Sequence, residues 1–286
     1  MENKHSDSKQ VYDVFINVEA HRLAADLIRN HSTNLTDVRC VALDGLDLRH
    51  CRDILDIGCG FGFFTEALKG RIHPDSLITG IDIIQDYEPL FLEVCKKAGF
   101  HGRFFSSGYS LLKNFPGKSY DLVLCSYALY FFPEAIPDIA KVLKDSGVFV
   151  TITHDQNNMD ELIDATKEIL TAKETLKKNR LPFEDIVSRF SAENGFDRLA
   201  SWFGRVETID YLNRLVFRPE EIQNLVEYFR FKSPFFLAGT DFEIEKVAAL
   251  LTRYLEESSH AKQGFTLSKN DRIFICSLPV LDGKPR

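Results

Sequence analysis

The residues best suited to chemistry are a glycine-rich loop and one acid that follows it. Residues 56–62 read DIGCGFG and lie between an apolar run and a helical one. Glycine lets the backbone turn tightly and approach a ligand, while a helix N-terminus offers unpaired N–H groups to a negative group. Asp82 lies 24 residues after Gly58, near the offset of about 20 at which an acid binds ribose hydroxyls. Together these features predict a nucleoside-binding cleft.

The spacing of the glycines argues against a dinucleotide ligand. A dinucleotide fingerprint has the form G-x-G-x-x-G, but the position of its third glycine is Phe63 here. A pyrophosphate site is therefore disfavoured, and so is a nicotinamide-dependent oxidoreductase. Hydride transfer to a nicotinamide cofactor would revive that alternative.

Alternating strands and helices must position the loop. Apolar runs at 53–57, 76–83, 100–107, 120–129 and 147–153 alternate with helical segments at 63–69, 89–100 and 133–144. This alternation predicts β-α-β units with right-handed crossovers and a parallel sheet, whose ligand crevice lies at the carboxyl ends of the strands. An amphipathic helix at 11–30 should pack on this body.

The chain after residue 154 is mostly helical. Helices are expected at 159–178, 181–190, 219–231 and 241–258, with strand-like runs at 205–217 and 271–280 that pair antiparallel at one sheet edge. The helical insert between them would form a cap. We expect a single domain over residues 1–286, with an N-terminal helical region at 1–50, a cofactor-binding core at 51–155, and insertions, cap and edge strands at 156–286.

Four segments resemble the class I S-adenosylmethionine-dependent methyltransferases. DIGCGFG at 56–62 matches their first motif, GID at 80–82 their second, SYDLVLCSYALYFF at 119–132 their fourth-strand motif, and KVLKDSGVFVTI at 141–152 their fifth-strand approach. The resemblance covers about residues 50 to 155. It implies an α/β fold with a doubly wound, seven-stranded, mostly parallel, Rossmann-like sheet, the sixth and seventh strands antiparallel, and helical cap insertions. The element order after the fifth strand is similar to that of the histamine N-methyltransferases.

The resemblance also implies S-adenosyl-L-methionine as the cofactor and a role for each motif residue. The loop backbone would cradle the methionine part of the cofactor, and Asp56 would orient the loop and the cofactor's amino group through water. Asp82 would accept hydrogen bonds from both ribose hydroxyls. Ile83 would lie against the adenine face. The cradle residues are Gly58, Cys59, Gly60 and Gly62.

Three further cofactor contacts are implied at other motifs. Ser126, after the fourth strand, would contact the methionine end, and Tyr12 would close over the cofactor, although a place on the apolar face of a helix explains Tyr12 equally well. The chain reads Gly108-Tyr109-Ser110 where the family commonly has Gly-Asp-Ala. Adenine recognition should therefore use Ser110 or backbone groups.

The catalytic residue stays open at this stage. His154 and Asp155 directly follow the fifth strand at the cleft rim, where one of them would be a base or an amine anchor. The alternative that we favour is a polar loop start ahead of a helix. Tyr130 is a third candidate, in a run where a histidine is often found. Methyl transfer needs a base only when the nucleophile arrives protonated.

Composition excludes several classes of protein. The chain has 44% apolar residues and a net charge of −7, so it is neither disordered nor fibrous, and nucleic acid is disfavoured as a partner. Its six cysteines lack C-x-x-C spacing, which predicts buried thiols and no metal. The polar N-terminus and the lack of a long apolar run predict a cytoplasmic protein that is not bound to a membrane.

The expected substrate is a small molecule, methylated on nitrogen or oxygen. Enzymes acting on the exocyclic amines of bases carry an Asn- or Asp-Pro-Pro-aromatic tetrad after the fourth strand, and the chain reads Cys-Ser-Tyr-Ala at 125–128. The alternative is a non-catalytic S-adenosylmethionine-binding regulatory or scaffold protein. Phenylalanines of the C-terminal segment are expected to be mainly core. The oligomeric state, monomer or homodimer, stays open.

Overall fold

The structure, a computed structural model, describes residues 9, 11–171, 180–238 and 240–281. By its internal contacts the chain divides into two compact units. Unit 1 comprises Met1–Leu35, Gln156–Ser188 and Leu212–Asn270, and unit 2 comprises Thr36–Asp155, Arg189–Tyr211 and Asp271–Arg286. A single domain over the whole chain stays a prediction.

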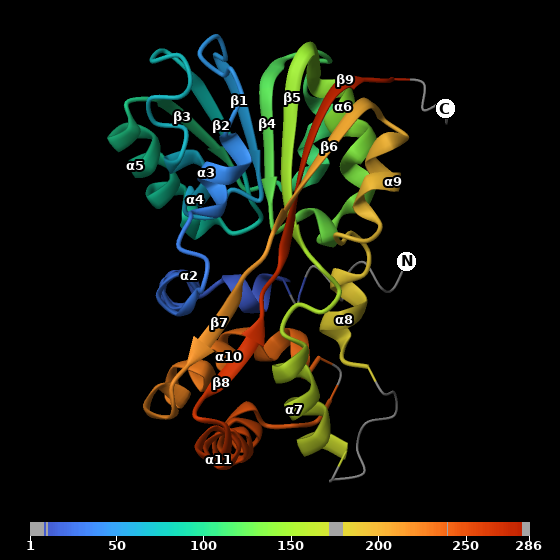
Figure 1. Ribbon diagram of the computed structural model, residues 1–286. Helices are drawn as coiled ribbons and strands as arrows, with labels where there is room; N and C mark the ends of the chain where they lie inside the picture. The colour runs from blue at the N-terminus through green and yellow to red at the C-terminus, as the bar shows by residue number, and fades with distance from the viewer. Residues whose placement is uncertain (1–8, 10, 172–179, 239, 282–286) are drawn as a thin grey trace. The chain divides into compact units, whose positions relative to one another are not determined.

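Unit 2 contains a seven-stranded sheet in the order β3-β2-β1-β4-β5-β9-β6 (Figure 1). Strands β1 to β5 pair in parallel, whereas β9 runs antiparallel to both β5 and β6. This arrangement confirms the predicted doubly wound fold. The strands are β1 (Asp53–Ile57), β2 (Leu77–Ile81), β3 (His101–Phe105), β4 (Tyr120–Ser126), β5 (Leu143–His154), β6 (Phe203–Tyr211) and β9 (Asp271–Pro279).

Helices cover both faces of this sheet. In Figure 1, α3, α4 and α5 lie on one side of the strands and α6 and α9 on the other. The α-helices are α3 (Val38–Leu43), α4 (Phe63–Glu66), α5 (Glu88–Ala98), α6 (Ile136–Val142) and α9 (Gly195–Ala200). Short 3₁₀ helices join them at η1 (Gln85–Tyr87), η2 (Tyr109–Asn114), η3 (Leu129–Phe131) and η4 (Pro133–Ala135).

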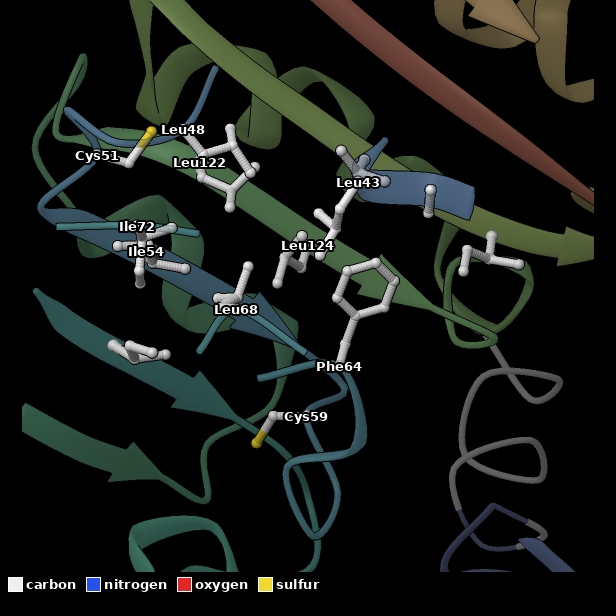
Figure 2. Packing of buried hydrophobic residues seen from close by; sticks show 14 of the residues in the cluster. Leu43, Leu48, Cys51, Ile54, Cys59, Phe64, Leu68, Ile72, Leu122 and Leu124 are labelled. Atoms are coloured by element: carbon white, nitrogen blue, oxygen red, sulfur yellow. The ribbon is translucent and has the colours of Figure 1, made fainter. Parts of the chain in front are cut away.

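The buried core of unit 2 fixes the strand that carries the glycine loop. Ile54 of β1 and Leu122 and Leu124 of β4 are fully buried and share one cluster with Phe64 of α4 and Leu43 of α3 (Figure 2). Residues two apart on a strand point to the same face, so Leu122 and Leu124 both face these helices. The core therefore holds the end of β1 and the start of α4, between which the loop must turn.

Unit 1 is mainly helical. Its helices are α2 (Val18–His31), α7 (Asp160–Thr171), α8 (Pro182–Val187), α10 (Ile222–Phe236) and α11 (Ile244–Lys262), with a short 3₁₀ helix η5 (Pro219–Glu221). Strands β7 (Arg214–Phe217) and β8 (Phe265–Ser268) form a separate antiparallel pair. Among the described residues, no helix of either unit is long and apolar enough to cross a bilayer.

The prediction of one strand over residues 205–217 is wrong. The run divides into β6, at the edge of the large sheet, and β7, which pairs with β8 in unit 1. Asn213 lies at the break, where its backbone N–H donates to Asn270 Oδ1 and its side-chain oxygen accepts from the Asn34 N–H. These side-chain bonds take the place of a ladder, so the strand ends here.

Other predicted elements need smaller corrections. The helix expected over 11–30 breaks before α2, because the Asn17 side chain accepts from the Ala20 N–H and caps a new helix. Leu23 of α2 is 60% exposed, so not every apolar residue of the predicted amphipathic helix is buried. Helix α9 and strand β8 were not expected, and the helix predicted over 159–178 extends partly outside the described residues. Cys40 is exposed, whereas the other five cysteines are buried as predicted.

Candidate active site

The glycine loop follows β1, and its three glycines all have positive φ angles, a backbone conformation that favours glycine. The φ angles of Gly58, Gly60 and Gly62 are 69°, 49° and 89°. The Gly58 N–H donates to the carbonyl oxygen of Ile81 at 2.7 Å, which ties the loop to the end of β2. A Cβ at position 58 would lie 2.6 Å from the Cβ of Ala128. The loop is therefore closely packed as well as sharply turned.

Asp82 links the second strand to this loop. Its Oδ2 accepts from the Gly60 N–H at 2.9 Å, and its Oδ1 accepts from the Ile84 N–H at 3.0 Å. Burial raises the pKa of the Asp82 carboxyl, and the backbone N–H donors oppose that rise. Each carboxylate oxygen has two lone-pair sites, so capacity remains for two hydroxyl donors.

Asp56 lies beneath the loop and is 1% exposed. Its Oδ2 accepts from the Thr65 hydroxyl at 2.7 Å, which connects β1 to helix α4. Burial raises the pKa of Asp56 to about 7. The predicted roles of Asp56, orienting the loop and contacting the cofactor through water, stay predictions.

The raised pKa of Asp56 has a consequence for stability. A carboxyl with a folded pKa of about 7 and an unfolded value of 3.8 binds more protons when folded, so its contribution is full below pH 3.8 and is lost as pH rises to 7. We expect the unfolding free energy of the ligand-free protein to fall between pH 5 and pH 8. This fall should be about 2–3 kcal/mol larger in the native chain than in Asp56→Asn. Urea unfolding at both pH values measures this difference, and parallel losses in the two proteins would contradict it.

The remaining predicted cofactor residues lie in different surroundings. Cys59 is buried, and its sulfur packs where a side chain at Gly80 would lie, so only its backbone can face a ligand in the loop. Ile83 is 38% exposed beside Gly108, and its contact with adenine stays a prediction. The Ser110 hydroxyl instead donates to the Ser107 carbonyl oxygen at 3.2 Å. Its role in adenine recognition stays a prediction.

Tyr109 stands where the family's acid is common, and it makes contacts of its own. Its hydroxyl donates to Glu134 Oε1 at 2.8 Å, and its ring stacks on Phe132 at 4.7 Å between ring centroids. Burial raises the pKa of Tyr109 to about 12, so the hydroxyl remains a donor at neutral pH. No carboxylate occupies this position of the sequence.

Ser126, at the end of β4, carries a buried hydroxyl oxygen without a hydrogen-bond partner among the described residues. A buried polar atom of this kind costs free energy unless a ligand or water satisfies it. Together with a glycine cradle too narrow for a Cβ at position 58 and the spare capacity of Asp82, it fits the nucleoside and amino-acid parts of S-adenosylmethionine.

Four side chains form a buried cluster at the carboxyl ends of β4 and β5. His154 Nδ1 lies 2.6 Å from Asp271 Oδ1, and the Tyr127 hydroxyl donates to Asp271 Oδ2 at 2.7 Å. The His154 ring stacks on Tyr127 at 4.8 Å and on Tyr130 at 5.8 Å between centroids. His154 and Asp271 are each 5% exposed. An ionised Asp271 keeps the proton on Nδ1 and leaves Nε2 as the acceptor nitrogen.

Tyr127 is held in an unusual backbone conformation. Its φ is 54°, in the left-handed region that a bulky residue rarely adopts. The N–H donates to the Ile152 carbonyl oxygen at 2.9 Å, and the hydroxyl and ring are fixed by Asp271 and His154. Such strain persists where surrounding contacts over-determine it, and it concentrates at functional sites.

Sequence reasoning identified His154 and Tyr130 as candidates but missed Tyr127 and Asp271. Asp271 is 117 residues from His154 in sequence and reaches it only because β9 pairs antiparallel with β5, with His154 opposite Asp271. The only local signal was an acid at the start of the last predicted strand. Our interpretation of His154 as a polar loop start disagrees with its burial, while its catalytic role stays a prediction.

The two remaining predicted site residues are Asp155 and Tyr12. Asp155 directly follows β5 and is half-buried. Tyr12 belongs to unit 1 and is 46% exposed, so its closure over the cofactor stays a prediction. Among the residues with described positions, no group of three or more His, Cys, Asp or Glu side chains is arranged to hold a metal ion.

Comparisons with known proteins agree with this geometry. Residues 54–147 match a family model described as a methyltransferase domain. The uncharacterized methyltransferase YcgJ of Bacillus subtilis is 27% identical over 104 residues, which are 35% of this chain and 40% of that protein. A demethylmenaquinone methyltransferase of Geobacillus stearothermophilus is 23% identical over 159 residues, which are 54% of this chain and 66% of that protein.

A solved structure supports the fold alone. The crystal structure of Bacillus subtilis YcgJ aligns with a TM-score of 0.52 at 16% identity, covering 84% of this chain and 97% of that one. Residues 54–147 therefore match a methyltransferase domain in sequence, and they lie in a sheet of the class I methyltransferase order. The resemblance noted in the sequence is thereby confirmed.

Proposed function

We propose that this protein is an S-adenosylmethionine-dependent methyltransferase that acts on a nitrogen or oxygen of a small molecule. The observation that carries the proposal is the glycine loop bonded to Asp82 through the Gly60 N–H. This pairing brings the backbone of the first motif to the carboxylate of the second motif. It supports a site that binds the ribose of a nucleoside ligand at Asp82 and the amino-acid part of the same ligand at the glycine loop.

The chain's own residues would bind and align this ligand. Asp82 would accept the ribose hydroxyls, Ile83 would lie against the adenine, and the hydroxyl of Ser126 would donate to the methionine end. When bound, the cofactor supplies a methyl group on a cationic sulfur, so the leaving group is already activated. The protein then has to orient the acceptor atom in line with that methyl group and exclude water.

We further propose that His154 accepts the proton that the acceptor atom must lose. Methylation would leave the acceptor nitrogen or oxygen with one proton to lose, and His154 Nε2 would take that proton. Asp271 stabilises the resulting imidazolium, because its carboxylate lies 2.6 Å from Nδ1. Asp155 and Tyr130 are then neighbours of the base rather than the base.

A small-molecule acceptor is supported by the sequence after β4 and by one relative. Residues 125–128 lack the tetrad of base-modifying enzymes, and the net charge of −7 disfavours nucleic acid. The Geobacillus relative is named for a quinone acceptor, demethylmenaquinone. The chain spans only 40% and 66% of the two relatives compared, so the substrate in the Geobacillus relative's name is not assigned to it.

Calorimetric titration with S-adenosylmethionine, S-adenosylhomocysteine and NAD tests the proposal. We expect micromolar binding of the first two and none of NAD. Binding without methyl transfer to a panel of amines, phenols and carboxylates would favour a regulatory or scaffold role. Lack of binding of both sulfur nucleosides would refute the cofactor assignment.

Asp82→Ala should weaken S-adenosylhomocysteine binding by about 1–3 kcal/mol, because a carboxylate that accepts ribose hydroxyls is lost. Asp121→Ala is the matched control. That carboxylate also accepts two backbone N–H groups, from Arg52 and Asp53 at 2.9 and 3.0 Å, but it lies at the opposite end of the strands. Calorimetric titration measures the S-adenosylhomocysteine affinity of both variants. Equal affinities of Asp82→Ala and Asp121→Ala would exclude Asp82 from the cofactor site.

A further inference from the structure

An ammonium group in unit 1 lies among phenylalanine rings. Lys232 Nζ is 5.3 Å from the ring centroid of Phe231 and 5.9 Å from those of Phe15, Phe183 and Phe235. Lys232 and two of the rings belong to α10, Phe183 to α8, and Phe15 to the helical residues before α2. Three segments distant in sequence therefore place aromatic rings around one cation. We call these five residues the Lys232 cluster.

A second lysine lies close enough to affect the charge of Lys232. Lys269, only 3% exposed, repels Lys232, and burial together with this repulsion lowers the pKa of Lys232 to about 7. His21 stacks on Phe231 with 5.6 Å between centroids. Burial, and then the charge of Lys232, lowers the pKa of His21 to about 3. His21 is therefore neutral and adds no third charge.

In the described part of the chain, Lys232 differs from Lys167 in lacking a carboxylate partner. Among the described residues no carboxylate forms an ion pair with Lys232, and the aromatic rings surround its ammonium group. Lys167 of the same unit, in contrast, lies 2.9 Å from Glu184 Oε1. Ring faces attract a cation but replace only part of its lost hydration.

The Lys232 cluster is not fully enclosed. Lys232, Phe231 and Phe15 are half-buried residues, so part of each residue is exposed to solvent. The cluster combines one cation with aromatic carbon. An anion that arrives with an apolar body would satisfy both features at once, because the charge pairs with Lys232 while the body packs on the rings.

We propose that the Lys232 cluster binds the carboxylate of a small molecule whose adjoining part is apolar or aromatic. The carboxylate supplies the counter-charge for Lys232, and the rings of Phe15 and Phe231 contact the apolar part. This inference does not rest on the proposed function, because all residues of the cluster belong to unit 1.

The probes are 4-phenylbutyrate and 4-phenylbutanol, which share a skeleton but differ in charge. Calorimetric titration of the full chain without a sulfur nucleoside should show 4-phenylbutyrate binding roughly tenfold or more tightly than the alcohol. Equal affinity for the two probes, or no binding of 4-phenylbutyrate up to millimolar concentration, would overturn the proposal. A protein that binds the carboxylate but no sulfur nucleoside would keep this inference and refute the proposed function.

Lys232→Met then assigns the effect to the residue. We expect it to bind 4-phenylbutyrate roughly tenfold or more weakly and 4-phenylbutanol within twofold of the native chain. Lys246→Met is the control, because that exposed lysine of α11 pairs with Glu243 at 2.7 Å and should change neither affinity. Unchanged carboxylate affinity in Lys232→Met would overturn the proposal. Unaltered S-adenosylhomocysteine binding by Lys232→Met would show that this variant is folded. If Lys232→Met does not fold, the comparison of the two probes on the native chain still tests the proposal.

Discussion

Gly58→Ala is expected to weaken S-adenosylhomocysteine binding roughly 100-fold or more, the larger of the two binding losses that we predict at the cofactor site. The φ of 69° costs a residue with a Cβ about 1–2 kcal/mol. The new Cβ would also lie 2.6 Å from the Cβ of Ala128, so the loop or the segment after β4 must move. Either movement displaces backbone N–H groups that the proposed function assigns to the ligand. Calorimetric titration measures the loss.

Gly45→Ala separates the effect of the site from the effect of backbone strain. Gly45 has a φ of 72° in the same unit, but a Cβ added there would have no neighbouring atom within 4 Å. We expect a similar cost in unfolding free energy from strain, about 1–2 kcal/mol, with S-adenosylhomocysteine affinity unchanged. If Gly58→Ala bound the ligand as well as Gly45→Ala does, the loop would not be the cradle.

His154→Asn is expected to lower the rate of methyl transfer by about 10²–10⁴-fold, the range for loss of a positioned general base. The amide can still donate to Asp271, so the buried carboxylate keeps a partner and the fold should survive. The affinity for S-adenosylhomocysteine should stay within twofold of the native value, because the proposed role of His154 is to accept the proton and not to bind the cofactor. Initial rates with an acceptor from the amine, phenol and carboxylate panel provide the measurement.

The pH profile distinguishes a base from a structural histidine. The native enzyme should lose activity as pH falls through the pKa of the base, and His154→Asn should lack that inflection. Tyr127→Phe is the comparison variant, since it removes the 2.7 Å bond to Asp271 but retains the histidine. We expect it to keep the inflection and lose roughly tenfold in rate or less. A His154→Asn rate within threefold of the native rate would exclude His154 as the base.

Most of the sheet and the cofactor loop could be predicted from the sequence because their determinants are local. The runs at 53–57 and 77–81 are mainly apolar; glycines follow the first, and Asp82 follows the second. A strand that ends in DIGCGFG and a second that ends in an acid leave few arrangements in a right-handed parallel sheet. The bond from Gly60 to Asp82 follows from that topology, because neighbouring parallel strands end at the same edge.

Elements whose boundaries depend on distant partners were predicted less well. The run at 205–217 has continuous strand composition, yet it divides at Asn213, which bonds to Asn34 and Asn270. Local propensity cannot report such partners, because residues 34 and 270 lie far away in the sequence. The same reason explains the break before α2, where a single cap at Asn17 outweighs a continuous apolar pattern.

The sequence by itself determined the fold class, the family and the cofactor loop, whereas tertiary structure decided which side chains meet. His154 gains its acid only through the register that sets it opposite Asp271 in the antiparallel pairing of β5 and β9. Lys232 gains its rings from three segments that share no local pattern. Backbone turns and strand ends are encoded within a few residues, but the environment of a buried charge is the sum of contacts from the whole folded unit.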